Sequence, residues 1–169
     1  MLQRIQTVYM LGSVIAILMM LLFPLGTISS TSATFSLSAL GISSVTEEFP
    51  YDVMRYPLII LLLIMFVLPL FCIFMYNKRK MQLRILIYSA IVDLLFYAYF
   101  FMFETSACYD LVSNALHIAE MSEELEIGYR FHLFAMPAVS CFCCIMAFRG
   151  VAYDIALLES ADRLRPSRK

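Results

Sequence analysis

The chain has 169 residues, of which 62% are apolar, and a formal net charge of −1. Soluble domains are about 45–50% apolar, so this composition argues against a water-soluble globular fold and predicts a membrane protein. No Lys/Arg run is long enough to predict nucleic-acid binding. Four spanning helices would leave no room for a second domain, so we expect one membrane domain over residues 1–169.

Four apolar segments predict four transmembrane helices, because each is close to the length of about 20 residues that crosses a bilayer. They cover about residues 5–25, 57–76, 83–103 and 131–148. The first segment is longer than the core of a signal peptide and no A-x-A-type site follows it, so we predict a retained span. The predicted fold is therefore an all-α bundle of four transmembrane helices.

Two loops of different character join these spans on one side of the membrane. Residues 26–56 are rich in Ser and Thr, and residues 34–40 largely alternate apolar and small polar residues before Gly41. That period is typical of a half-buried strand, so we predict a small β-hairpin there. In the second loop, residues 104–130, apolar residues at helical spacing predict a helix over about 109–119.

The tail over residues 149–169 carries a third pattern. Val151, Ile155 and Leu158 recur at helical spacing and charged residues lie among and after them. We predict that this stretch extends the fourth helix into the cytoplasm, at or near the membrane interface.

The basic residues predict how the chain is oriented. Ten of them fall on the side that holds both termini: Arg4, Lys78, Arg79, Lys80, Arg84, Arg149, Arg163, Arg165, Arg168 and Lys169. Only Arg55 and Arg130 fall on the other side. Because Lys and Arg concentrate in cytoplasmic segments, we predict a multi-pass membrane protein with both termini in the cytoplasm.

The two ends of the chain carry a recognisable pattern. Residues 1–9, which include Arg4, read Met-Leu-Gln-Arg-Ile-Gln-Thr-Val-Tyr. Residues 147–151, with Arg149 and Gly150, read Ala-Phe-Arg-Gly-Val, and residues 159–165 add Asp162 and Arg163. These ends resemble a family of small four-span membrane proteins from Bacteroidota, known as domain of unknown function number 4293. The resemblance implies a four-helix inner-membrane protein and implies no activity.

Asp93 is the only acidic residue within a predicted span. A carboxyl at such depth marks a candidate functional site, and it is expected to face the bundle in a protonated or hydrogen-bonded form. Ser89 and Tyr97 lie one turn away on the same helical face. Two interpretations stay open: a polar group that fixes how the helices pack, or a residue of a proton or ion pathway.

Cys141 and Cys144 form a Cys-x-x-Cys pair in the fourth span. Four-span enzymes that pass electrons between thiols and a quinone use a pair of this spacing, with further cysteines in their outer loops. Here the outer loops hold only Cys108, and Cys141 lies some ten residues inside its span. The alternative is that these cysteines pack as small apolar residues between helices.

These patterns favour an interaction role over catalysis. We expect a structural or interaction partner of other membrane or envelope proteins, embedded in the lipid bilayer, with no cofactor and no bound metal. The alternatives are a quinone-linked thiol oxidoreductase that uses Cys141 and Cys144, and a proton-linked transporter or channel component that uses Asp93.

Overall fold

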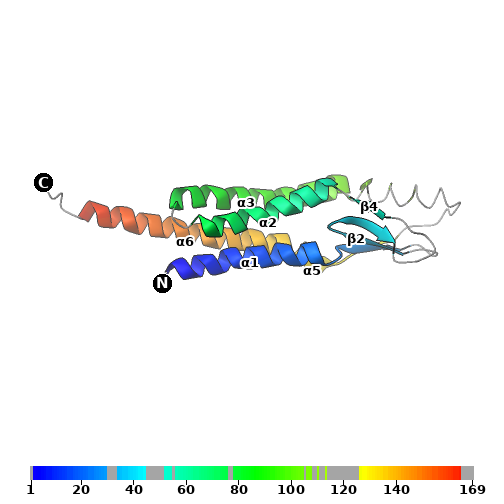
Figure 1. Ribbon diagram of the computed structural model, residues 1–169, viewed down its shortest axis with the longest axis horizontal. Helices are drawn as coiled ribbons and strands as arrows, with labels where there is room; N and C mark the ends of the chain where they lie inside the picture. Colours follow the sequence, from blue (N-terminus) through cyan, green and yellow to red (C-terminus); the bar gives the residue numbers. More distant parts are fainter. Residues whose placement is uncertain are drawn as a thin grey trace.

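The computed structural model describes residues 2–29, 34–44, 52–54, 56–75, 78–104, 106–107, 110, 113 and 126–164. Within these residues, four helices are long and apolar enough to cross a membrane. They run side by side, and a small antiparallel sheet covers one end of the bundle (Figure 1). The start of the first helix and the end of the last lie away from the sheet (Figure 1). The predicted four-helix membrane bundle is confirmed.

The helices follow one another in antiparallel order. They are α1 (Leu2–Leu22), α2 (Tyr56–Phe74), α3 (Arg79–Tyr99) with the π-helical turn η1 (Phe100–Glu104), the single turn α5 (Phe131–Phe134), and α6 (Met136–Leu164). The break between α5 and α6 falls at Ala135, two residues before Pro137, which has no amide hydrogen to donate to the preceding turn.

Several helix ends differ from the prediction, among them the end of α1 and the start of α3. Helix α1 ends at Leu22, three residues early, because Pro24 interrupts the helix and the amide of Leu25 donates to the carbonyl of Leu37 at 2.6 Å. Helix α3 begins at Arg79, four residues early. Lys, Arg and Gln are good helix formers, so the polar residues before the apolar segment join its first turns.

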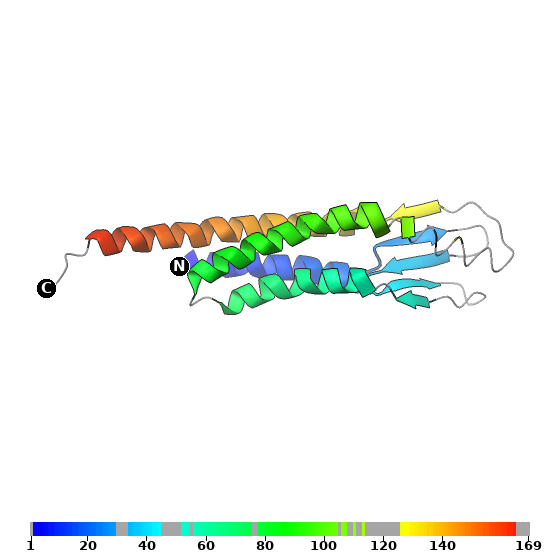
Figure 2. The same ribbon diagram turned by 90° about the horizontal axis from the view of Figure 1, so that it is seen from above.

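The tail prediction holds for its helical part. Helix α6 continues without a break to Leu164 and projects beyond the ends of the other helices (Figures 1 and 2). Val151 is buried, Ile155 is half-buried, and Leu157 and Leu158 are exposed on the projecting part.

The described strands form one five-stranded sheet in the order β4-β3-β2-β1-β5. Their bounds are β1 (Gly26–Ser29), β2 (Thr34–Ser38), β3 (Gly41–Ser44), β4 (Asp52–Met54) and β5 (Glu126–Tyr129). Strands β2 and β3 are the predicted hairpin, and Gly41 has a φ of 148°, which favours glycine. Strands β1, β4 and β5 were not predicted. Strand β5 belongs to the second loop, so both loops build one sheet.

The predicted helix over residues 109–119 lies mostly outside the described residues. The two described positions within it, Asp110 and Ser113, are helical.

The described buried apolar residues form two clusters at different levels of the bundle. The one nearer the sheet joins Ile28, Phe35, Leu37 and Ile42 of the strands to all four bundle helices. The one farther from the sheet includes Met10 of α1, Leu86 of α3 and Ala147 of α6. Because the first cluster is shared, the sheet and the bundle have a common hydrophobic core.

The outside of the bundle is apolar as well. Exposed large side chains cover every long helix, among them Val8 and Leu11 of α1, Ile60 of α2, Leu94 of α3 and Phe142 of α6. Soluble monomers rarely expose so extensive an apolar surface, whereas the hydrocarbon of a bilayer covers it without cost.

A buried polar cluster as the candidate functional site

A layer of polar side chains separates the two apolar clusters. Asp93 of α3 is fully buried there. Three serines are fully buried with it: Ser13 of α1, Ser89 of α3 and Ser140 of α6. Along α1, for example, Met10 belongs to the cluster far from the sheet and Ile17 to the cluster near it, with Ser13 between them. The sequence therefore places one polar layer within three packed helices.

Hydrogen bonds join these side chains across the helices. The Ser140 hydroxyl donates to Oδ2 of Asp93 at 2.8 Å, which ties α6 to α3. The hydroxyls of Ser13 and Ser140 are also 2.8 Å apart, so Ser13 donates to Ser140 when Ser140 donates to the carboxyl. The Cys144 thiol donates to Ser89 Oγ at 3.4 Å. A connected set of small polar groups thus links α1, α3 and α6.

One carboxyl oxygen of Asp93 differs from the other polar atoms of the cluster in its hydrogen bonding. Oδ1 of Asp93 is buried and has no hydrogen-bond partner among the described residues. A buried acceptor without a partner is costly, and an ionisable side chain at this depth is unusual unless it ties helices together or takes part in proton movement. The arrangement can therefore do two things: hold three helices together through Oδ2, and accept a hydrogen bond or a proton at Oδ1.

The three residues of the predicted polar site do not all meet. Ser89 and Asp93 both lie in the buried layer. Tyr97 points elsewhere: its hydroxyl donates to the carbonyl of Phe134 and accepts from the amide of Ala138 at 3.1 Å. Those two contacts satisfy backbone groups on either side of the α5–α6 break, so Tyr97 stabilises the break next to Pro137.

Sequence reasoning did not identify Ser13 and Ser140. A serine in an apolar segment carries no periodic signal, because it is tolerated at lipid-facing and helix-facing positions alike. The available signal is small-residue spacing. It applies to Ser140, because Ser140 and Cys144 on α6 are four residues apart, which is typical of closely packed membrane helices. It does not apply to Ser13, because the residues four positions away are Tyr9 and Ile17.

The cysteines of α6 pack against neighbouring helices. Cys144 is fully buried and hydrogen-bonded to Ser89, Cys141 contacts the carbonyl of Ala90 at 3.9 Å, and a Cβ on Gly12 would lie 3.5 Å from the sulfur of Cys143. None of the four described cysteines forms a disulfide. These contacts are those of small side chains between helices.

We expect Cys141 and Cys144 to be dispensable. The double substitution Cys141→Ala/Cys144→Ser removes both thiols and keeps a donor beside Ser89, so abundance, growth and quinone-linked thiol oxidation are expected to stay unchanged. Cys143→Ala, at the neighbouring position of α6, is the matched control. Loss of growth or of thiol oxidation in the double variant at normal abundance would overturn the interaction role and favour a redox enzyme.

Residues from the two terminal sequence patterns contact each other in the structure. Gln6 of α1 donates through Nε2 to Oδ2 of Asp154 at 2.8 Å. A Cβ on Gly150 would lie 2.8 Å from Cγ of Gln6, so glycine permits the close approach of α1 and α6. Arg149 is exposed beside this contact. Arg4 lies near the start of α1, and Asp162 and Arg163 lie near the end of α6.

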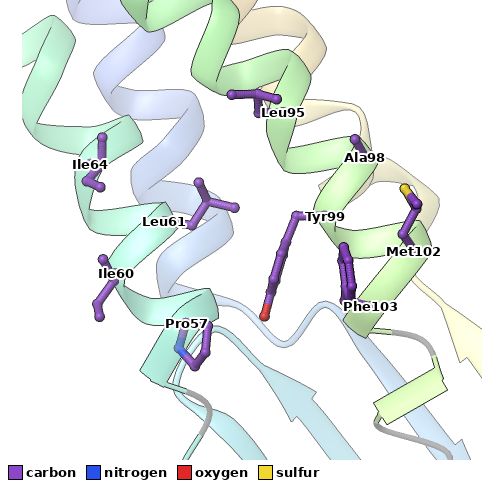
Figure 3. Close-up of a pocket in the computed structure, with 9 residues that line it drawn as sticks. All are labelled: Pro57, Ile60, Leu61, Ile64, Leu95, Ala98, Tyr99, Met102 and Phe103. Carbon is purple, nitrogen blue, oxygen red and sulfur yellow. The ribbon is translucent and has the colours of Figure 1, made fainter.

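An apolar groove lies between α2 and α3 near the sheet (Figure 3). It has a volume of about 500 Å³. Its lining consists of Pro57, Ile60, Leu61, Ile64, Leu95, Ala98, Tyr99, Met102 and Phe103. The only polar side-chain group in that lining is the Tyr99 hydroxyl, so the groove has the chemistry of a surface in contact with acyl chains.

Fold and site together define a small four-helix membrane bundle with a buried polar layer and a sheet at one end. The chain belongs to the family described as "Domain of unknown function (DUF4293)", whose model matches residues 2–164. The predicted family resemblance is confirmed by this match. No curated protein matches the chain.

Proposed function

We propose that this chain is an integral protein of the bacterial inner membrane that serves as a structural or interaction partner of other envelope proteins. The observation that carries the proposal is the shared core of the sheet and the bundle. Residues of three strands and four helices pack in one cluster, so the sheet is a fixed platform on the membrane-embedded bundle. Such a platform presents a constant surface to a partner.

The orientation follows from the charges. Lys78 precedes α3, and Arg79, Lys80 and Arg84 lie in the first two turns of that helix. The start of α3 is at the end of the bundle away from the sheet (Figure 1). Arg149 lies level with the start of α1, because its neighbour Gly150 packs on Gln6. The positive-inside rule therefore supports a cytoplasmic location for both termini and an outer location for the sheet.

The sheet offers a row of side chains suited to docking. Ser29 of β1 pairs with Thr34 of β2 on one side and with Glu126 of β5 on the other. Thr34 and Glu126 are exposed and Ser29 is half-buried. The row joins both loops and ends at the edge strand β5, where a partner could contact side chains and backbone together.

A quantitative pull-down tests this role. The chain carries a C-terminal tag and is purified in mild detergent, and co-purifying proteins are measured by mass spectrometry. The variant Thr34→Arg/Glu126→Arg changes the outer row, and Tyr153→Arg/Leu157→Arg makes an equally drastic change at exposed positions on α6. We expect the outer-row variant to lose an envelope protein that the α6 variant retains. Equal recovery with both variants would contradict the proposal.

Asp93 supports a second candidate function. Its unpartnered Oδ1 and the adjoining hydroxyls of Ser140 and Ser13 form a site that can take up a proton inside the bundle. A proton-linked transporter or channel component would use this group, and substitution of Asp93 separates this function from the interaction role.

A further inference from the structure

A second groove lies at the other end of the molecule, where α6 leaves the bundle. One wall is Lys78 with the first turn of α3, and the other is the projecting part of α6. The groove has a volume of about 560 Å³. Its charged lining residues are Lys78, Arg79, Lys80 and Glu159. It is distinct from the apolar groove between α2 and α3, which is lined by residues near the sheet.

The charges in this groove are unbalanced. Three cations face one carboxylate, and no described carboxylate is close enough to form an ion pair with Lys78, Arg79 or Lys80. Toward the bundle, the next carboxylate of α6 is Asp154, which is hydrogen-bonded to Gln6. In the other direction it is Asp162, whose side chain lies outside the described part of the chain. An excess of cations gives the groove a positive potential, which attracts an anionic ligand.

The rest of the lining is apolar. Ile155 and Leu158 of α6 line the groove beside the cations, and Leu158 is 50% exposed. The groove also lies where the apolar exterior ends, since Phe74 at the end of α2 is strongly exposed and Lys78 follows four residues later. A site at this level meets the headgroups and the first acyl carbons of a bilayer.

We propose that this groove binds the phosphate of an anionic phospholipid from the surrounding leaflet. The Lys78, Arg79 and Lys80 side chains hold the phosphate. The first carbons of the acyl chains, next to the headgroup, lie against Ile155 and Leu158. Cations alone would accept any anion. The apolar wall on α6 is what selects a lipid over free phosphate.

Native mass spectrometry of the purified full chain tests the site. The probes are dioleoylphosphatidylglycerol, dioleoylphosphatidylcholine and inorganic phosphate, each titrated into detergent-solubilised protein. Lys78→Gln/Lys80→Gln removes two groove cations, while Arg84→Gln/Arg149→Gln removes two exposed cations outside the groove. Leu158→Asn removes part of the apolar wall and leaves every charge in place.

The expected result is binding of phosphatidylglycerol, and not of phosphatidylcholine, at one site. The groove double variant weakens that binding roughly thirtyfold, from the usual contribution of two cations near an anionic lipid. The control variant leaves it unchanged, and Leu158→Asn weakens it severalfold without affecting inorganic phosphate.

Two results would overturn the proposal. Equal weakening by both double variants would show diffuse attraction to the basic end. Equal affinity for inorganic phosphate and phosphatidylglycerol would show a site for free phosphate. If the groove double variant melts at a lower temperature before lipid is added, Leu158→Asn decides: retained lipid binding in that variant refutes the site.

Discussion

Asp93→Asn is expected to leave the protein folded and abundant, whereas Asp93→Leu is expected to destabilise it. Asparagine has the shape of aspartate and keeps an oxygen that can accept from Ser140. Leucine removes the acceptor at the centre of the polar layer. The hydrogen bond from Ser140 of α6 to Asp93 of α3 is then lost, and the Ser13–Ser140 pair of hydroxyls loses its carboxyl acceptor.

The expected loss for Asp93→Leu is roughly 0.6–2 kcal/mol of helix association, by comparison with hydrogen bonds measured between membrane helices. Melting temperature in detergent and abundance in the membrane measure it. Ser140→Ala and the double variant complete a mutant cycle. Because both single substitutions break the same bond, their effects are expected to be less than additive.

The same substitutions separate architecture from transport. If Asp93 only joins helices, the asparagine variant is expected to grow like the wild type. If its unpartnered oxygen exchanges a proton in a transport cycle, asparagine cannot replace it. A stable and abundant Asp93→Asn protein that fails to support growth would contradict the interaction role and establish the second candidate function.

The helices could be predicted because the length and composition of a span are local properties of the chain. Their ends were less accurate, since they depend on contacts. The end of α1 is set by the amide of Leu25, which donates to Leu37 in the sheet. No sequence window that ends at Leu25 contains that information.

The sheet was predictable only where its pattern is local. Strands β2 and β3 are joined by a short turn, and their alternation is visible in one stretch of sequence. Strand β5 pairs with β1 across most of the chain, with Ile28 opposite Ile127. A strand this short is identified from the strands it pairs with more than from its own residues.

The polar site shows the same limit. Asp93 is conspicuous because a carboxyl in an apolar segment is rare, and Ser89 follows from helical spacing. Ser13 and Ser140 join the site through the close packing of α6 with α1 and α3. Tyr97 has the right spacing, but its side chain reaches the α5–α6 break instead. Helical periodicity identifies a face, and only the packed bundle identifies its partners.

The second prediction concerns the orientation of the chain in the membrane. We expect a cysteine at one end of the bundle to be labelled completely in intact spheroplasts and a cysteine at the other end not to be labelled. Single cysteines are introduced as Thr34→Cys in the sheet and as Lys80→Cys and Glu159→Cys at the opposite end, all at exposed positions. The background carries Cys108→Ser, and the parent without a new cysteine is the control. Labelling with a membrane-impermeant maleimide is measured by gel shift in intact spheroplasts and again after permeabilisation.

This labelling tests most directly the claim that the chain spans the inner membrane with its sheet outside and both termini in the cytoplasm. We predict that Thr34→Cys reacts in intact spheroplasts, whereas Lys80→Cys and Glu159→Cys react only after permeabilisation, because the positive-inside rule assigns the basic end of the bundle to the cytoplasm. Labelling of Lys80→Cys in intact spheroplasts, with Thr34→Cys protected, would contradict the account.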